Sequence, residues 1–229
     1  MMRCSLFVII FFTLLSCQKS SAVGEGIKKD STSITWLALG DSYTIGESVS
    51  MSDRFPAQSL ELLKQKSVRT EKLTYIAKTG WTSANLEQAI IDLNPTPHDI
   101  VTLLIGVNDQ FQGIDTVTYS RNFRSILNRA INLTQGANEN VIVLSIPDYS
   151  ATPFSKSLDT AKISREIDTF NSINYRITQE YNCNYIYITD LTREAKSIRK
   201  LIATDSLHPS GMAYRQWAEK LNTLIGKKF

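Results

Sequence analysis

The sequence is poor in the residues from which proteins build metal centres and disulfide frameworks. Of its 229 residues, three are cysteine and two are histidine. It contains no His-x-x-x-His pair and no closely spaced pair of cysteines, whereas catalytic zinc usually needs three protein ligands at defined spacing. We therefore expect no metal site and no cofactor. Cys4 and Cys17 both lie near the N-terminus, so Cys183 has no partner in the rest of the chain and is expected to be a buried structural thiol.

A large excess of charge is also absent. The chain has 25 Lys and Arg against 22 Asp and Glu, a formal charge of +3. These residues form no basic stripe and no acidic tail, which argues against nucleic acid or another polyanion as a partner. The glycine motifs that cradle phosphates, Gly-x-Gly-x-x-Gly and Walker A, are missing too, which argues against a nucleotide-binding protein. The composition, 42% hydrophobic and 21% charged, is that of one ordinary globular domain.

The only long apolar run lies at the N-terminal end. Arg3 precedes an almost unbroken apolar stretch at residues 4–16, which is too short to span a bilayer comfortably and is followed by polar residues. These features are typical of an export signal. Leu14-Leu15-Ser16-Cys17 resembles the bacterial lipobox, in which the cysteine is lipidated and becomes the first mature residue. A plain secretory peptide is the alternative.

The resulting prediction for the N-terminal segment has three parts. Residues 1–16 form a lipoprotein signal peptide, and residues 17–33 comprise the lipidated Cys17 and a flexible tether rich in Ser, Lys, Gly and Asp. The protein is exported and is anchored through Cys17 to a bacterial membrane, on the periplasmic or cell-surface side.

Short apolar runs alternate with longer amphipathic segments in residues 34–229. The runs predict strands at residues 34–39, 73–77, 100–105, 141–146 and 185–188. The amphipathic segments predict helices at residues 56–66, 83–93, 117–132, 163–181 and 211–225. Apolar strands separated by helices favour a parallel sheet that is covered on both faces. We expect one α/β domain, a three-layer α/β/α sandwich with a five-stranded parallel sheet in flavodoxin-like order.

The first predicted strand ends in Gly40-Asp41-Ser42. Gly40 allows a tight turn, and Ser42 then stands at the carboxyl end of a strand, the edge where such sheets bind ligands. A serine in contact with a base is a nucleophile, and its backbone N–H can face a developing oxyanion. The alternative is that Asp41 or Ser42 only caps the next segment.

Gly80 and Asn108 follow the next two predicted strands. Gly80 is either a turn residue or a position where the backbone N–H approaches a ligand without a side chain in the way. Asn108 is either a turn asparagine or a side-chain amide that donates to an oxyanion beside backbone N–H groups.

Two histidines are the candidates for a base at neutral pH. His98 precedes the third predicted strand, on the opposite edge of the sheet, and is expected to be structural. His208 stands just before the last predicted helix, with Asp205 three residues earlier. A carboxylate at this spacing can hold the Nδ1–H of the imidazole and leave Nε2 free to take a serine proton.

Together these motifs resemble those of the SGNH (GDSL-like) hydrolases, in the family's order along the chain. They are Gly40-Asp41-Ser42, Gly80, Gly106-Val107-Asn108-Asp109 and Asp205-Ser206-Leu207-His208. The resemblance implies that Ser42 is the nucleophile, His208 the general base and acid, and Asp205 the residue that orients the imidazole. It also implies an oxyanion hole of the backbone N–H groups of Ser42 and Gly80 and the Asn108 side chain. Tyr43 is a departure, because the GDSL name expects leucine there.

We therefore expect a serine esterase that cleaves carboxylic esters of carbohydrate or small-molecule alcohols. The absence of a Gly-x-Ser-x-Gly elbow counts against the α/β-hydrolase fold. Residues 111–113 and 147–154, including Asp148, Tyr149 and Phe154, either line a pocket or form surface loops. No long apolar lid segment is present, which favours a short acyl group such as acetyl. The alternatives are a long-chain lipase or lysophospholipase of the same family and a non-catalytic glycan-binding surface lipoprotein.

Overall fold

The protein is built on one five-stranded parallel sheet. The computed structural model describes Met1 and residues 33–228. Its strands are β1 (Ser33–Gly40), β2 (Arg69–Ala77), β3 (Ile100–Leu104), β4 (Val141–Leu144) and β5 (Asn184–Ile186). All neighbouring strands are parallel, in the order β2-β1-β3-β4-β5. This is the flavodoxin-like order, so the predicted fold is confirmed.

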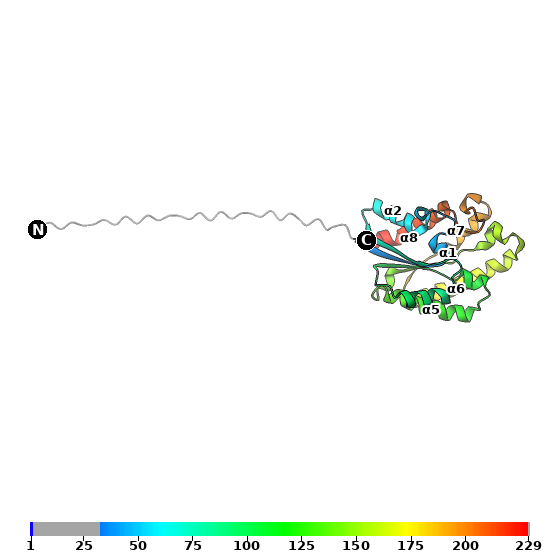
Figure 1. Cartoon of the computed structure of the whole chain (residues 1–229), viewed down its shortest axis with the longest axis horizontal. Coiled ribbons are helices and arrows are strands. Elements are labelled where there is room, and N and C mark those ends of the chain that lie inside the picture. Colours follow the sequence, from blue (N-terminus) through cyan, green and yellow to red (C-terminus); the bar gives the residue numbers. More distant parts are fainter. Residues whose placement is uncertain (2–32, 229) are drawn as a thin grey trace. The chain divides into compact units, whose positions relative to one another are not determined.

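Helices cover both faces of this sheet. Figure 1 shows α2 and α8 on one face and α5 and α6 on the other, and α5 packs against both α3 and α6. In the described part of the chain the α-helices are α1 (Ser42–Ile45), α2 (Phe55–Gln65), α3 (Ser83–Leu93), α4 (Val107–Phe111), α5 (Thr116–Asn132), α6 (Thr160–Glu180), α7 (Thr189–Arg193) and α8 (Gly211–Lys228). The 3-10 helices are η1 (Met51–Asp53), η2 (Asn138–Asn140), η3 (Tyr149–Ala151), η4 (Pro153–Ser157), η5 (Glu194–Lys196) and η6 (Arg199–Leu201). The result is a three-layer sandwich.

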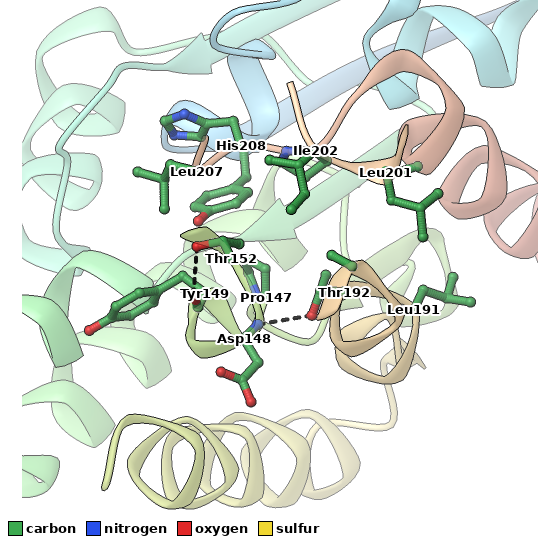
Figure 2. A pocket seen from close by; sticks show the side chains of 14 residues that line it. Pro147, Asp148, Tyr149, Thr152, Leu191, Thr192, Leu201, Ile202, Leu207 and His208 are labelled. Carbon is green, nitrogen blue, oxygen red and sulfur yellow. Dashed lines mark hydrogen bonds between the residues drawn. The ribbon is translucent and has the colours of Figure 1, made fainter. Parts of the chain in front are cut away.

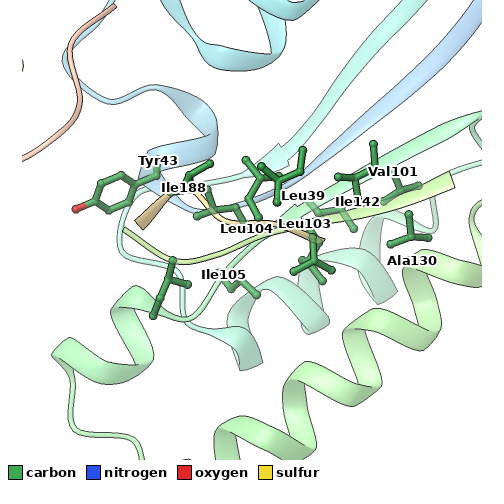
Figure 3. Close-up of a cluster of buried hydrophobic side chains, with 14 of the residues drawn as sticks. Leu39, Tyr43, Val101, Leu103, Leu104, Ile105, Ala130, Ile142 and Ile188 are labelled. Carbon is green, nitrogen blue, oxygen red and sulfur yellow. The ribbon is translucent and has the colours of Figure 1, made fainter. Parts of the chain in front are cut away.

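The central strands are buried on both faces. Every residue of β3 and of β4 is buried, as expected for a sheet between two layers of helices. Figure 3 shows Leu39 of β1, Leu103 of β3 and Ile142 of β4 among a cluster of buried side chains. The polar Thr102 of β3 is satisfied because its Oγ1 accepts the indole N–H of Trp36 at 3.0 Å. This packed sheet provides a rigid edge for the loops that follow the strands.

The strand boundaries differ from the prediction where burial and backbone pairing diverge. β2 begins at Arg69, because residues 69–72 pair with β1 although their side chains are mostly exposed and carry no apolar pattern. β4 and β5 end two residues before their apolar runs do, yet Ile146 and Ile188 are still buried. An apolar pattern reports burial and not pairing. The four- and five-residue helices α1, α4 and α7 were not predicted, because they are too short to show a helical period.

The N-terminal predictions concern residues outside the described part. The signal peptide, the lipidation at Cys17 and the tether fall there, apart from Met1 and Ser33. The predicted domain start at residue 34 lies one residue after β1 begins. Among the helices that the structure describes, none has the length and apolar character to cross a membrane. Cys183 is buried, as predicted, and this burial, with the nearby carboxylate of Glu139, raises the pKa of its thiol to about 11.

Candidate active site

Ser42 is held at the carboxyl end of β1. Asp41 caps α1 by accepting the backbone N–H of Tyr43 at 3.0 Å, and Ser42 is the first residue of that helix. A Cβ built on Gly40 would lie 2.1 Å from Oγ1 of Thr44 and 2.5 Å from the carbonyl oxygen of Leu104. Glycine is therefore required at position 40 by close packing rather than by a special backbone angle. Asp41 takes the capping role, which leaves the Ser42 hydroxyl free to face the site.

Asp205 and His208 lie on one tight loop before α8. An antiparallel bridge between Ile202 and Pro209 closes this loop. Oδ1 of Asp205 accepts the backbone N–H groups of Leu207 at 2.9 Å and of His208 at 3.0 Å. An aspartate that bonds to the backbone two and three residues later stabilises a turn, which explains the three-residue spacing of the pair.

The fold brings Ser42, His208 and Asp205 into one hydrogen-bonded chain. Nε2 of His208 lies 2.9 Å from Oγ of Ser42, and Nδ1 lies 2.6 Å from Oδ2 of Asp205. Ser42 and His208 are 4% and 6% exposed. The ring of Tyr43 packs against the imidazole with the two centroids 4.9 Å apart. The departure from leucine at position 43 thus places an aromatic wall beside the histidine.

The charge state of Asp205 suits a residue that orients an imidazole. Burial alone would raise the pKa of Asp205, but hydrogen bonds from His208, from the backbone N–H of Leu207 and from the hydroxyl of Ser48 hold it well below its usual value. The carboxyl group is therefore ionised at neutral pH. It can accept Nδ1–H of His208, which leaves Nε2 as the acceptor that faces Ser42.

The residues predicted to bind an oxyanion lie on the same edge of the sheet. Nδ2 of Asn108 donates to the carbonyl of Trp81 at 3.0 Å and lies 3.4 Å from Oδ2 of Asp41. Gly80 has φ +81°, a conformation that glycine adopts readily. Among the described residues, none accepts the backbone N–H of Ser42 or that of Gly80. Two backbone donors and one anchored amide are thus available.

A pair of buried carboxylates supports these loops. Burial raises the pKa of Asp41 to about 8, against the lowering effect of the hydrogen bond from Tyr43, and the nearby carboxylate of Asp109 raises it further. Asp109 accepts the backbone N–H of Ser83 at 2.8 Å and also the Ser83 hydroxyl. It therefore fastens the start of α3 to the helix that carries Asn108. The sequence gives no sign of this contact, because nothing in the Gly-x-Asn-Asp motif indicates which residue the aspartate will bind.

The raised pKa of Asp41 predicts a stability that falls as pH rises. The folded protein keeps a proton that the unfolded chain releases near pH 3.8, so this contribution is fully present below pH 3.8 and is lost as pH rises through about 8. One proton gives a slope of at most about 1.4 kcal/mol per pH unit. Asp41→Asn has no proton to lose. We expect it to flatten the dependence of the free energy of unfolding on pH, measured by urea denaturation from pH 4.5 to 8.5.

Two other aspartates affect how this experiment is interpreted. The pKa of Asp109 is also raised, so the free energy of unfolding of Asp41→Asn should still fall somewhat as pH rises. The lowered pKa of Asp205 contributes stability that is lost only below its usual value of 3.8, outside this range. A slope in Asp41→Asn as steep as that of the wild type would contradict the assignment to Asp41.

Ser42 and His208 open into a cleft with aromatic walls. The cleft measures about 390 Å³, counting space open to solvent, and is lined by Ser42, Tyr43, Val107, Asn108, Phe111, Tyr149, Phe154, Leu207 and His208. The rings of Phe111, Tyr149 and Phe154 contact one another, with centroids 5.9 to 6.3 Å apart. Gly80 is not among the lining residues, but the carbonyl of the adjacent Trp81 holds Asn108.

Residues 111–113 and 147–154, the two segments expected either to line a pocket or to form surface loops, both reach the cleft through Phe111, Tyr149 and Phe154. Not every residue of these segments lines the cleft. Asp148 is buried instead, where its Oδ2 accepts Nε of Arg193 at 2.8 Å and the hydroxyl of Ser164 at 2.7 Å. These bonds tie the loop after β4 to α6 and α7. Asp148 thus holds the neighbouring Tyr149 in place without facing the cleft.

A second, apolar pocket adjoins the cleft (Figure 2). It shares Tyr43, Tyr149, Leu207 and His208 with the cleft. Its other lining residues are Pro147, Asp148, Thr152, Leu191, Thr192, Ala195, Leu201, Ile202, Pro209 and Ala213. Figure 2 shows the imidazole of His208 pointing away from this pocket. The pocket is narrow: its interior has room for only about 20 Å³, roughly the space of one water molecule. Its walls suit an apolar group.

His98 lies away from the other site residues, at the amino end of β3. Its Nδ1 lies 2.7 Å from the carbonyl of Thr96, and its Nε2 lies 3.3 Å from Oγ1 of Thr74. Both ring nitrogens thus have structural partners. In the part of the chain that the structure describes, no three His, Cys, Asp or Glu side chains gather as a metal site would require.

The parallel sheet and the motifs on its carboxyl edge define a hydrolase of the SGNH class. The chain belongs to the GDSL-like lipase/acylhydrolase family, whose model matches residues 38–216. A search of curated proteins gave no match.

Solved structures of lipolytic proteins and esterases share the fold. A lipolytic protein of the G-D-S-L family from Veillonella parvula DSM 2008 is 18% identical, with a TM-score of 0.66, over 86% of this chain and 100% of that chain. An acetylxylan esterase from Geobacillus stearothermophilus is 19% identical, with a TM-score of 0.63, over 84% and 94%. TesA is 18% identical, with a TM-score of 0.64, over 84% and 98%. At these identities the likeness shows the fold alone.

Proposed function

We propose that the protein is a serine esterase that hydrolyses short-chain acyl esters, above all acetyl esters, of carbohydrate or small-molecule alcohols. The main support for this proposal is the 2.9 Å contact between Oγ of Ser42 and Nε2 of His208. On the other side of the imidazole, Nδ1 lies 2.6 Å from Oδ2 of Asp205. A serine that served only as a helix cap would need neither the contact with His208 nor the aspartate beyond it. Ser42 and His208 also line a cleft that is open to a ligand.

Acylation begins at the Ser42 hydroxyl. His208 takes its proton while Oγ bonds to the ester carbonyl carbon, and the carbonyl oxygen gains the electron pair of its π bond. The backbone N–H groups of Ser42 and Gly80 and the Asn108 amide then donate to this oxyanion. The contact from Asn108 to Asp41, at 3.4 Å, is long, so one amide hydrogen can turn to the oxyanion while Trp81 keeps the other. Loss of one such donor typically lowers turnover about 10²- to 10³-fold.

The remaining steps return the enzyme to its starting state. The alcohol leaves as its oxygen takes the proton from His208, and the acyl group stays bonded to Ser42. Water then gives a proton to His208 and attacks the acyl carbon, and the acid is released as Oγ regains its proton. Asp205 stays ionised throughout and stabilises the imidazolium in each half of the reaction.

The cleft and one related structure support a small, partly apolar substrate. Phe111 and Phe154 are exposed at the cleft, and aromatic faces of this kind offer apolar contact to a sugar ring or a small alcohol. The acetylxylan esterase that shares the fold acts, by its name, on an acetylated carbohydrate. We therefore place acetylated carbohydrates first among the substrates.

The apolar pocket beside the cleft favours a second candidate function, a long-chain lipase or lysophospholipase. Leu191, Leu201, Ile202 and Leu207 contribute to its walls, and an acyl chain that entered it would leave water. Each buried CH₂ group would then contribute about 0.8 kcal/mol, or about fourfold in kcat/KM.

A series of p-nitrophenyl esters tests the proposed function and separates it from this second candidate. An octanoyl chain would have to push apart the walls of the narrow apolar pocket, which typically costs about 1 to 3 kcal/mol. For the purified protein we therefore expect kcat/KM for the acetate to exceed that for the octanoate at least about tenfold. A kcat/KM that rises from acetate through butyrate to octanoate would instead favour the long-chain enzyme. In that case Ala195→Leu, which narrows the apolar pocket, should lower kcat/KM for the octanoate below that for the acetate. No hydrolysis of any ester would favour the non-catalytic glycan-binding protein.

We also propose that the protein is a lipoprotein anchored through Cys17. The support is the Leu14-Leu15-Ser16-Cys17 sequence behind a short apolar run. Cys17→Ala should move the protein from the membrane fraction to the soluble fraction, as measured by immunoblot after cell lysis. Equal membrane retention of the variant and the wild type would contradict lipidation at this residue.

A further inference from the structure

Ser48 makes a contact with the triad that the family motifs do not include. Its hydroxyl donates to Oδ2 of Asp205 at 2.7 Å. This is the same oxygen that lies 2.6 Å from Nδ1 of His208. The other oxygen, Oδ1, is taken by the backbone N–H groups of Leu207 and His208. Among the described residues, Ser48 thus provides the one hydrogen bond to this carboxylate from outside the loop 202–209.

The turn that carries Ser48 is itself anchored to other parts of the site. The backbone N–H of Glu47 donates to the carbonyl of Ser42 at 3.0 Å. The carboxylate of Glu47 accepts the hydroxyl of Thr79, the residue before Gly80. Val49, the residue after Ser48, packs against the hydrophobic core. The Ser48 hydroxyl is therefore held in place although the residue is exposed, and its turn joins the loops that carry Ser42, Gly80 and Asp205.

The backbone at Ser48 shows that glycine would fit this position at lower conformational cost. Its φ is +65°, in the left-handed region that costs a serine roughly 1 kcal/mol and glycine almost nothing. What serine supplies here and glycine does not is the hydroxyl. The bond from this hydroxyl is one of the interactions that hold the pKa of Asp205 low.

We propose that Ser48 is a positioning residue of the active site, whose hydroxyl fixes the Asp205 carboxylate and through it the orientation of the His208 ring. Ser48 touches neither the substrate nor the reacting atoms. It limits rotation of the carboxylate, so that Nε2 of His208 stays aimed at Oγ of Ser42. This inference rests on the proposed esterase function.

The Ser48→Gly variant distinguishes a positioning role in catalysis from a role in stabilising the fold, because kcat and the melting temperature should respond differently. It removes the hydroxyl and relieves the backbone cost, so the melting temperature should stay the same or rise. We expect kcat for p-nitrophenyl acetate to fall about three- to tenfold, a range set by a hydrogen bond to a charged but partly exposed group. KM should change less than about twofold, because no contact with the substrate is lost.

Two further variants serve as rescue and control. Ser48→Asn restores a side-chain donor, and asparagine tolerates the left-handed region, so kcat should return to within about twofold of the wild type. Ser50→Ala removes a hydroxyl from the same loop. Within the described part of the chain, the hydrogen-bond partners of the Ser50 hydroxyl are Ser52 and Asp53 alone, so kcat should be unchanged.

These measurements distinguish failure of the Ser48 proposal from failure of the esterase proposal. If the wild type hydrolyses no ester, the esterase proposal fails and Ser48 has no reaction to serve. If the wild type is active and Ser48→Gly has the same kcat, the positioning role is refuted. It is also refuted if kcat falls only in step with a lower melting temperature, or if Ser48→Asn is as slow as Ser48→Gly.

Discussion

Replacing Ser42 by alanine is expected to abolish ester hydrolysis while the fold survives. In the proposed mechanism this variant lacks the oxygen that would form the acyl-enzyme, and the oxyanion donors alone should leave only a small residual rate. Removal of a nucleophilic serine typically lowers kcat by about 10⁴-fold or more. The measurement is kcat for p-nitrophenyl acetate. The melting temperature should change little, because the only hydrogen-bond partner of the Ser42 hydroxyl among the described residues is His208.

Covalent labelling gives an independent check on Ser42. An alkyl fluorophosphonate should form one phosphorus–oxygen bond to Oγ with loss of fluoride, while the serine proton goes to His208. Mass spectrometry of the digested wild type should place the added mass on the peptide that contains Ser42, and Ser42→Ala should take up none. Undiminished hydrolysis by the variant, or a label on another serine, would remove Ser42 from the mechanism.

The second large effect is expected at His208. His208→Gln keeps a polar side chain of similar size but cannot take the Ser42 proton, so kcat should fall about 10⁴-fold at pH 7.5, as when one member of such a triad is lost. His98→Gln is the matched control. The nitrogens of His98 contact Thr96 and Thr74 at the amino end of β3, so this variant should keep kcat within about threefold of the wild type.

Equal losses in the two histidine variants would show that the two residues have been assigned wrongly. Thermal unfolding distinguishes a folding defect from a catalytic one. A His98→Gln protein that loses activity only because it melts earlier should recover it at a lower assay temperature, whereas His208→Gln should not.

The site depends on three loops that leave the same edge of a rigid sheet. Parallel pairing places Gly40 of β1 beside Ala77 of β2 and Leu104 of β3. The residues that follow, including Ser42, Gly80 and Asn108, must then emerge side by side. The His208 loop comes from a different part of the chain, before α8, and it reaches the site because its own bridge and the Asp205 turn hold it in one conformation.

Much of this could be predicted without coordinates, because it depends on local patterns. Apolar runs long enough to be buried on both faces, separated by amphipathic segments, predict a parallel sheet under two layers of helices. Polar motifs at the strand ends then identify Ser42, Gly80 and Asn108, since the ends of parallel strands share an edge. The scarcity of histidine narrowed the base to His98 or His208, and the Asp205 spacing favoured the second.

Only the tertiary structure decided how these residues are supported and what surrounds them. Ser48 and Asp205 are 157 residues apart, and Asp109 and Ser83 are 26 apart. Phe111 ends α4, whereas Tyr149 and Phe154 lie in η3 and η4, yet their rings contact one another. Such contacts leave no periodic or local signal, because they depend on where the packed core sets each loop. Local residue pattern thus determined the sheet and the order of its motifs, and the packing of distant segments decided the hydrogen bonds, the burial and the shape of the cleft.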